Sequence, residues 1–480
     1  MCMSYVHGII FSGFTITRFT AMPGAGAYRL RTYLEQHGYP IEVVDYFEHW
    51  STEELIQIIE KLYNPNMKFI GFSVTFMLFN NSTLLNIIKK RWPTLHIVIG
   101  SPEPLRSRYV DTTAIRKNID MLFYGHAENA LLEYIKFLDG KVNTFIHETF
   151  DNGLKYVVSK DTYPYTDTND LSIIWKKDDP VSLVKALPIE LSRGCIFKCK
   201  FCSYPLIGKK SMDYIRDSDN LADEFKRNYD EFGINIYVFA DDTFNDSNFK
   251  LEMVRKAIAK SGINISFSAY IRYDLLHRNQ EQINILCEMG MHTAVLGIES
   301  LNERSRKIVG KGLTNDQVFY TLEKLKSTKK DLWVNNNFIV GLPGETIEDL
   351  LSTQTWVREQ NFKYLDSWHF EKLWIRQKSV SLISEFEKEP EKYGYNVISN
   401  TEWECATMNS TTAQMLADDF NKERDLIARP VGFNITSLLS LGYEANDLIG
   451  KKFKDIKTLP IARKIIATYI NSRLTQRKSI

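Results

Sequence analysis

Three cysteines stand within eight residues of this chain, in the segment Cys195-Ile-Phe-Lys-Cys199-Lys-Phe-Cys202. Cysteine thiolates are the usual protein ligands of iron–sulfur clusters, and three of them can hold three irons of a four-iron cluster. The fourth iron then lacks a protein ligand, and a metal position left open in this way is typical of a reactive site. An open iron can bind a small molecule and transfer an electron to it. The spacing therefore indicates a redox-active metal centre.

A zinc site is the alternative that the cysteines leave open. It would need a fourth ligand, yet the other cysteines (Cys2, Cys287 and Cys405) are far away in the sequence, and no second Cys-x-x-Cys pair occurs. Two-cluster ferredoxins use a different spacing, with a fourth cysteine followed by proline. A non-catalytic protein with an iron–sulfur or zinc centre for structure or sensing stays the rival class.

Alternating strand and helix patterns follow the cysteines and would position them. We predict strands at Pro188–Ser192, Ile236–Phe239, Ile265–Tyr270, Ala294–Ile298, Trp333–Val340 and Ser367–Leu373. Six strand–helix units give a partial barrel, fewer than the eight of a closed one. Because ligands of such barrels bind at the carboxyl ends of the strands, polar or glycine residues there are candidate ligand contacts. They are Asp241, Asp242, Ser268, Arg272, Glu299 and Gly341.

Each of these residues has a chemical reason to be a candidate and an ordinary alternative. Acidic residues accept hydrogen bonds from an ammonium group or a ribose diol, but Asp241 and Asp242 are equally typical of a helix cap or turn. Ser268 and Arg272 offer a hydroxyl and a guanidinium to a carboxylate or a substrate. Glycine at position 341 allows bare backbone to approach a flat ring.

The cysteine spacing, with Phe201 before the last cysteine, resembles that of the radical S-adenosylmethionine (radical SAM) enzymes. The segments Gly297-Ile-Glu-Ser300, Lys311-Gly312 and Gly341-Leu-Pro-Gly-Glu-Thr346 are similar to the branch that carries an N-terminal cobalamin-binding domain. The resemblance extends over residues 187 to about 375. It implies a [4Fe–4S] cluster on Cys195, Cys199 and Cys202, with S-adenosylmethionine as the second cofactor.

The same resemblance assigns the candidate residues to parts of S-adenosylmethionine. It implies that Phe201 and the stretch from Ile339 to Gly341 lie near the adenine. The stretch from Ala240 to Asp242 would meet the methionine amine. Ser268 and Glu299 would contact the ribose or the methionyl part.

Residues 1–140 also alternate strand and helix patterns, which predicts right-handed crossovers and an open parallel sheet. They resemble the cobalamin-binding domain of the same branch in Ala25-Gly-Ala-Tyr-Arg-Leu30 and Gly125-His-Ala-Glu128. The Asp-x-His-x-x-Gly motif that supplies a histidine to cobalt is absent, and Gly100-Ser101-Pro102 replaces the usual Gly-Gly. The resemblance therefore leaves open whether cobalamin binds or the domain is a scaffold. If it binds, we expect Arg18, Phe19 or Met22 in place of a histidine from the first loop.

The fold class that follows is α/β. A Rossmann-like open parallel sheet (1–140) and a linker (141–186) precede the partial (β/α)6 barrel (187–379), which a mainly helical C-terminal extension (380–480) caps. The formal net charge of +1 gives no field that would favour nucleic acid or an anionic membrane. No apolar stretch long enough for a membrane span, and no export signal, occurs, so we expect a cytoplasmic protein.

The sequence thus predicts an enzyme that cleaves S-adenosylmethionine reductively at the cluster and starts radical chemistry on a substrate that it does not identify. An external electron donor of the flavodoxin or ferredoxin type is expected. Methyl transfer is the specific expectation if cobalamin binds. Rearrangement, epimerisation, cyclisation or oxidation is the alternative without it.

Overall fold

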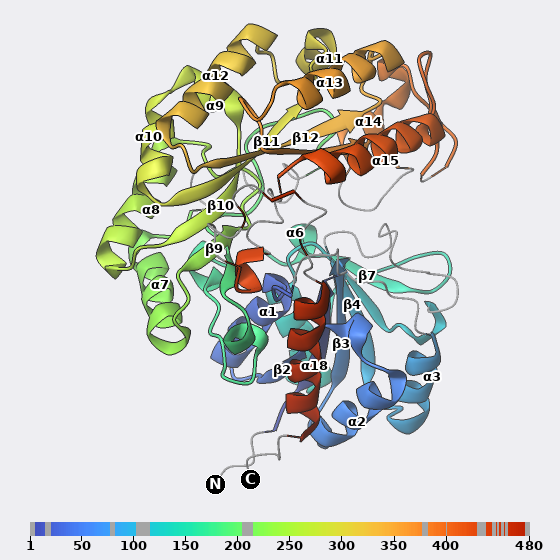
Figure 1. Ribbon diagram of the computed structural model, residues 1–480. Coiled ribbons are helices and arrows are strands. Elements are labelled where there is room, and N and C mark those ends of the chain that lie inside the picture. The colour runs from blue at the N-terminus through green and yellow to red at the C-terminus, as the bar shows by residue number, and fades with distance from the viewer. Residues whose placement is uncertain are drawn as a thin grey trace. The chain divides into compact units, whose positions relative to one another are not determined.

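The computed structural model describes residues 5–14, 21–76, 82–101, 116–203, 215–376, 383–399, 401–429, 438–443, 448, 451–452, 456 and 459–475. The chain forms two compact units (Figure 1): residues 1–188 with 459–480, and residues 189–458. The C-terminal stretch from 380 onward is therefore divided between the units. No described helix has both the length and the apolar character that crossing a membrane requires.

The first unit is built on a seven-stranded sheet in the order β2-β1-β3-β4-β5-β7-β6. All neighbouring strands are parallel except β6 and β7. The strands are β1 (Gly8–Phe14), β2 (Ile41–Val44), β3 (Phe69–Phe76), β4 (His96–Ser101), β5 (Met121–Tyr124), β6 (Glu148–Thr149) and β7 (Lys155–Val158). Its helices are α1 (Ala25–Gln36), α2 (Thr52–Leu62), α3 (Ser82–Arg91), α5 (Glu128–Leu138), α6 (Ser159–Thr162) and α18 (Leu459–Thr475).

Local sequence explains several of these boundaries. Helix α2 begins at a capping box, in which the Ser51 hydroxyl accepts from the amide of Glu54 and the Glu54 carboxylate accepts from the amide of Ser51. The predicted linker differs from the structure, because residues 155–158 add strand β7 to the sheet beside β5. This strand is only four residues long and is surrounded by turn-forming residues, so no periodicity indicated it.

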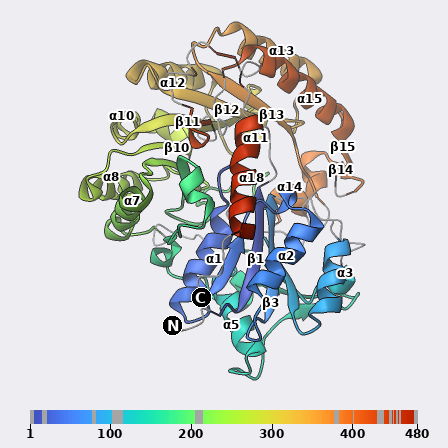
Figure 2. The ribbon, with the colours of Figure 1, turned by 60° about the horizontal axis from the view of Figure 1, so that its bottom comes forward.

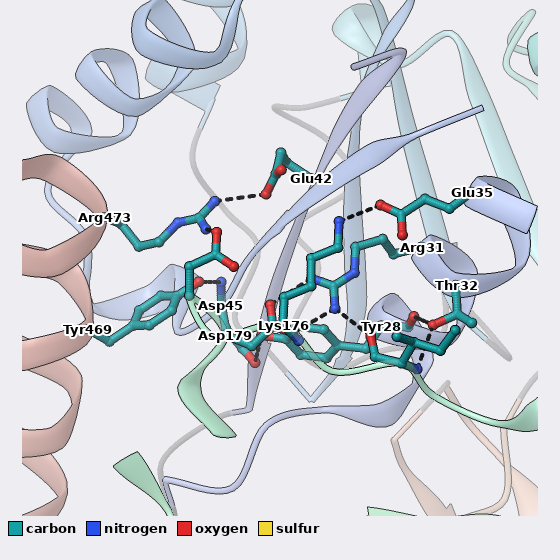
Figure 3. A network of polar contacts seen from close by, with 12 residues as sticks. Tyr28, Arg31, Thr32, Glu35, Glu42, Asp45, Lys176, Asp179, Tyr469 and Arg473 are labelled. Carbon is teal, nitrogen blue, oxygen red and sulfur yellow. Dashed lines mark hydrogen bonds and ion pairs between the residues drawn. The ribbon is translucent and has the colours of Figure 1, made fainter. Parts of the chain in front are cut away.

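Helix α18 comes from the far end of the chain and packs next to α2, as Figure 1 and Figure 2 show. The buried Arg473 at its end donates to Asp178 (2.6 Å) and Glu42 (3.0 Å). One turn earlier, the Tyr469 hydroxyl accepts from the amide of Asp45 (3.1 Å). Figure 3 shows Arg473 with Glu42 and Tyr469 with Asp45, beside the buried ion pair of Arg31 with Asp179. The last described helix is therefore part of the first unit.

The second unit is built on a six-stranded sheet in the order β8-β9-β10-β11-β12-β13, which follows the chain order. Figure 1 shows strands β9 to β12 curving inside an arc of helices, as in a partial barrel. The strands are β8 (Ala186–Ile189), β9 (Ile236–Phe239), β10 (Ser266–Ile271), β11 (Met291–Glu299), β12 (Trp333–Val340) and β13 (Ser367–Lys372). The intervening helices are α7 (Ser218–Phe232), α8 (Asn248–Ser261), α9 (Tyr273–Arg278), α10 (Glu281–Glu288), α11 (Glu303–Ile308), α12 (Asn315–Thr328) and α13 (Ile347–Glu359).

The last strand of this sheet, β13, has its outer edge covered. Helix α15 (Ser410–Ile427) packs along it, and the Asn421 side chain bonds both to the amide (3.0 Å) and to the carbonyl (2.7 Å) of Phe370. An amide side chain thus satisfies backbone groups that an edge strand would leave open to another chain. The remaining elements are α14 (Glu385–Lys388), β14 (Asn396–Val397) and β15 (Trp403–Glu404). The fold class expected from the sequence, two parallel α/β sheets with helices, is confirmed.

Candidate active site at the cysteine loop

The three cysteines lie on one loop beyond the carboxyl end of β8, the strand at one edge of the second sheet. We call residues 194–203 the cysteine loop. Gly194 opens it with φ of 71°, a left-handed conformation that glycine adopts without strain. The amide of Cys202 donates to the carbonyl of Cys199 (3.0 Å), which forms a turn between the last two cysteines. Cys195 is buried, and Cys199 and Cys202 are half-buried.

Asp241 holds the residues that lead into this loop. Its carboxylate accepts from the amide of Leu191 (3.0 Å) and from the hydroxyl of Ser192 (2.7 Å). It also forms an ion pair with Lys250 (2.7 Å), in which both side chains are fully buried. The carboxylate therefore positions the residues that lead into the cysteine loop.

Arg272, which follows β10, places a positive charge against the loop. Its guanidinium makes two bonds to Asp274 (2.9 Å each), and its Nη1 lies 3.4 Å from the sulfur of Cys199. The guanidinium also lies over the ring of Phe197, with Cζ 3.9 Å from the ring centroid. Burial acts to lower the pKa of Arg272, but the bonds and charge of Asp274 outweigh it and raise the pKa. A permanent cation is thus fixed beside the thiols.

The thiol of Cys195 faces the end of β9. Its sulfur lies 3.2 Å from the hydroxyl of Thr243. Burial raises the pKa of Cys195, and the hydrogen bond with Thr243 partly opposes this effect. A metal would remove this cost, because a coordinating thiol is deprotonated outright.

Glu299 ends β11 in a strained conformation, with φ of 69°. Its carboxylate forms an ion pair with Lys311 (2.5 Å), and both side chains are less than a tenth exposed. Burial opposes the charge on Lys311, but attraction by Glu299 and by Cys199 outweighs burial and raises the pKa of Lys311. The pair therefore places a second cation in the electrostatic surroundings of the cysteine loop.

The end of β12 is organised by a buried carboxylate. Glu345 accepts from Ser300 (2.5 Å) and from the amides of Gly341 (3.2 Å) and Leu342 (3.3 Å). Burial raises the pKa of Glu345 to about 7, although these bonds act to lower it. Trp403 packs against Gly341, where an added Cβ would meet its ring at 2.5 Å. Because residue 341 is a glycine, the Trp403 ring can pack closely against it and the backbone can turn after β12.

The remaining candidate residues lie at the same strand ends with different exposures. Ala240 is exposed, Asp242, Phe201 and Ile339 are half-buried, and Ser268 is 2% exposed. The structure thus brings Arg272 directly to a cysteine, turns Asp241 toward the protein and pairs Glu299 with a lysine. The sequence reasoning missed Thr243 and Asp274, although each lies within two residues of a candidate that it did identify.

The donor set of the cysteine loop fits an iron–sulfur cluster. Such a cluster takes each thiolate on a different iron, and three thiols on one loop beside Arg272 supply ligands and a compensating charge. In the part of the chain that the structure describes, no group of three His, Cys, Asp or Glu side chains is arranged to hold a single metal ion.

The strand order of the first sheet marks one edge as a candidate position for a ligand. Successive strands are added on opposite sides of β1, so the strand order reverses between β1 and β3, and parallel sheets bind ligands beyond the carboxyl ends at such a point. The residues that follow β1, β3 and β4 (15–20, 77–81 and 102–115) lie outside the described residues, and so do Arg18, Phe19 and Pro102. Met22 is described and is 8% exposed.

Comparison with known proteins agrees with this geometry. Residues 189–357 match the model of the radical SAM superfamily. An uncharacterised methyltransferase of Pyrococcus horikoshii is 31% identical over 175 residues, 36% of this chain and 37% of that protein. The anaerobic magnesium-protoporphyrin IX monomethyl ester cyclase of Cereibacter sphaeroides is 28% identical over 188 residues, 38% of this chain and 29% of that protein. The chain thus spans about a third of the length of these curated relatives.

Solved structures share the fold of both units. The radical S-adenosylmethionine methyltransferase TsrM of Kitasatospora setae, solved with cobalamin and a [4Fe–4S] cluster, has a TM-score of 0.62 at 14% identity. The match covers 83% of this chain and 80% of TsrM. The cobalamin-dependent S-adenosylmethionine radical enzyme OxsB has a TM-score of 0.55 at 14% identity, over 97% of this chain and 61% of OxsB. The similarity to the radical SAM superfamily therefore lies in the domain at residues 189–357, and the solved structures share the fold.

Proposed function

We propose that this protein is a radical SAM enzyme in which Cys195, Cys199 and Cys202 hold a [4Fe–4S] cluster. When bound, such a cluster supplies the electron that splits S-adenosylmethionine into methionine and a 5′-deoxyadenosyl radical. The observation that carries the proposal is the placement of three thiols on one strand-end loop, with Arg272 bonded to one of them. A fixed cation stabilises the anionic thiolates and raises the affinity of the cluster that they hold for an electron.

The candidate strand-end residues would then bind S-adenosylmethionine. Asp242, whose charge acts on Cys195, would accept from its ammonium group, and the half-buried Ile339 would offer an apolar surface to the adenine. Glu345 keeps the turn at Gly341 in shape, and Glu299 with Lys311 fixes the end of β11. These residues bind, orient and exclude water, while the cofactors carry the difficult chemistry.

Reductive cleavage tests this proposal. The anaerobically reconstituted protein, given dithionite and S-adenosylmethionine, should form 5′-deoxyadenosine and methionine. Each of Cys195→Ala, Cys199→Ala and Cys202→Ala should abolish product and lose most bound iron. Cys287→Ala, on α10, is the matched control and should keep both. Iron content unchanged in all three loop variants would contradict the proposal.

We further propose that the first unit binds cobalamin and that the reaction is a methyl transfer. Two observations support this: the sheet order with its reversal at β1 and β3, and the fold shared with TsrM and OxsB, whose structures contain cobalamin. Residues 15–20 contain no histidine, so the cobalt would have no histidine from that stretch beneath it. Anaerobic purification with hydroxocobalamin, followed by an optical spectrum, should show stoichiometric retention. If the purified protein retains no cobalamin after saturation with it, the cobalamin-independent radical reactions are the alternative.

An external reductant completes the proposed reaction, because the chain must receive one electron for each reductive cleavage. We propose a flavodoxin or a ferredoxin as that donor. A purified flavodoxin with its reductase should replace dithionite in the cleavage assay, and failure of several such donors would contradict this part of the proposal.

A further inference from the structure

Arg272 is held beside the cysteine loop by contacts of its side chain and of its backbone. The side-chain contacts are those with Asp274, with Cys199 and with the ring of Phe197. They keep the guanidinium in place only if the backbone stays fixed at the end of β10, because a shift of the backbone moves the whole side chain. The groups that hold the backbone of Arg272 therefore set the distance between this cation and the thiol of Cys199.

The side chain of Asn245 bonds to both backbone groups of Arg272. Its Oδ1 accepts from the amide of Arg272 (2.8 Å), and its Nδ2 donates to the carbonyl of the same residue (3.1 Å). The preceding residue, Phe244, donates its amide to the carbonyl of Tyr270 (2.9 Å). Residues 244 and 245 thus bond to the end of β10, where its pairing with β9 has stopped at Ser268. Asn245 is completely buried, so water does not compete for these bonds.

The amide of Asn245 is held in turn by Gln282 on α10. Its Nδ2 also donates to Oε1 of Gln282 (3.0 Å). The Nε2 atom of Gln282 donates to Oδ1 of Asn248 (2.9 Å) and to the carbonyl of Asn245 (3.4 Å). Because a backbone amide only donates and a carbonyl only accepts, the bonds to Arg272 allow one orientation of the Asn245 amide. Both donor hydrogens of that amide are used, and Gln282 is only 4% exposed.

This series of contacts connects α10 to the cysteine loop through neutral groups and one cation. Asn245 and Gln282 carry no net charge, so neither contributes a charge of its own to the field at Cys199. Their replacement changes that field through the position of Arg272. The attraction between a cation and a thiolate weakens as the distance between them grows.

We propose that Asn245 and Gln282 are positioning residues that keep Arg272 next to Cys199 and so set the reduction potential of the cluster. The inference rests on the proposed function for the presence of the cluster, whereas the contacts between Asn245 and Arg272 are independent of it. A cation fixed beside a thiolate ligand favours the reduced cluster, which carries one more negative charge.

The test compares midpoint potentials of the reconstituted full-length protein and its variants by potentiometric titration and electron resonance. Asn245→Leu replaces the amide with an apolar side chain of the same branching. It should lower the midpoint potential by about half or more of the shift that Arg272→Gln causes. Because Asn245 acts through the guanidinium, Asn245→Leu added to Arg272→Gln should cause no further shift. Gln282→Met is the milder variant and should shift the potential in the same direction by a smaller amount.

Asn421→Leu is the matched control. Asn421 on α15 bonds to the amide and to the carbonyl of Phe370, as Asn245 does to those of Arg272, but Phe370 carries no charge. This variant should lose stability without a change in midpoint potential.

A second measurement needs no cluster. In the cluster-free protein with nitrogen-15-labelled arginine, the Nε–H of Arg272, which donates to Asp274 (2.9 Å), is identified by its absence in Arg272→Gln. Its exchange with solvent should become about fivefold faster in Asn245→Leu, the change expected when one hydrogen bond is lost. In Asn421→Leu the exchange rate should stay unchanged.

Several results would overturn the proposal. They are an unchanged potential in Arg272→Gln, an unchanged potential in both Asn245→Leu and Gln282→Met, and an unchanged exchange rate in Asn245→Leu. A shift in Asn245→Leu that adds in full to that of Arg272→Gln would also overturn it, because Asn245 would then act by another route. If the wild type takes up no cluster, the proposed function is contradicted, while the exchange measurement still tests whether Asn245 positions Arg272.

Discussion

At the residue scale, the charged side chains around the cysteine loop are each held by an oppositely charged partner. Arg272 is bonded to Asp274 on one side and to Cys199 on the other. Asp241 is bonded to Lys250, and Glu299 to Lys311. In each case the cation or carboxylate near the loop is held by a partner at least nine-tenths buried, so its position does not depend on a ligand.

Arg272→Gln tests the electrostatic role of the guanidinium. Removing a cation next to Cys199 should make the cluster harder to reduce, and we expect a more negative midpoint potential. A tenfold change in a one-electron equilibrium corresponds to about 59 mV, which sets the expected order of magnitude. Potentiometric titration followed by electron resonance measures the shift. Arg255→Gln on α8, 54% exposed, is the control that should not move the potential.

Glu299→Gln tests the buried ion pair with two separate measurements. It leaves the charge of Lys311 buried without its carboxylate, which typically costs about 3–5 kcal/mol in the free energy of unfolding. The double variant Glu299→Gln with Lys311→Met should recover a large part of that loss in denaturant unfolding. If Glu299 also contacts S-adenosylmethionine, both variants should bind it about tenfold more weakly, and full affinity in the double variant would show that the carboxylate serves stability alone.

At the element scale, the turn after β12 illustrates how a distant segment completes a strand end. Trp403 is 1% exposed, donates to the carbonyl of Leu373 (2.8 Å) and packs on Gly341. Tyr395 donates to the carbonyl of Gly341 (2.7 Å). The segment around β14 and β15 therefore supports the turn that faces the candidate adenine position.

Gly341→Ala should destabilise the second unit. The residue has φ of 96°, and the new Cβ would lie 2.5 Å from the Trp403 ring. Backbone strain and overpacking together should cost about 2–4 kcal/mol. Thermal unfolding measures the loss against Gly312→Ala, where no atom lies within 4 Å of the added Cβ. Equal stability of the two variants would show that Trp403 moves aside without cost.

The sequence predicted some elements closely and others not at all, for physical reasons. Strand β9 has the predicted bounds, because a continuous apolar run between turn signals specifies a buried strand. Strand β12 also has the predicted bounds, although three asparagines stand between its apolar ends. Strand β7, which is as short as β9, was missed because turn-forming residues surround it. The cysteines could be recognised because their ligand chemistry is local in sequence. The bonds of Arg272 to Cys199 and of Asp241 to Lys250 could not, because they join separate elements.

At the scale of the whole molecule, the chain leaves the first unit at residue 188 and returns to it with α18. Nothing in the local pattern of residues 459–475 indicated this, because helix periodicity does not specify the partner of the buried face. Tyr469 of α18 takes part in this contact, because its hydroxyl accepts from the amide of Asp45. Burial raises the pKa of Asp45 to about 7, against the lowering effect of its bonds from Tyr46 and Tyr28.

This carboxyl group makes the first unit sensitive to pH. An aspartate in the unfolded chain has a pKa of about 3.9, so the folded state binds the proton more tightly. The resulting stabilisation is fully present below about pH 4 and is lost as pH rises through 7. The asparagine of Asp45→Asn cannot ionise. The free energy of unfolding of this variant, relative to that of the wild type, should therefore rise by roughly 2–4 kcal/mol between pH 5 and pH 8. The exposed Asp151→Asn is the control, and parallel pH profiles for Asp45→Asn and the wild type would contradict the assignment.

We propose that three thiolates hold a four-iron cluster whose remaining iron is open to S-adenosylmethionine. The most direct test is the electron resonance spectrum of the reduced, reconstituted protein before and after S-adenosylmethionine is added. We expect a [4Fe–4S]⁺ signal whose g values shift on addition, because the cofactor binds the iron that no cysteine occupies. A cluster signal that S-adenosylmethionine leaves unchanged at saturating concentration would contradict the account.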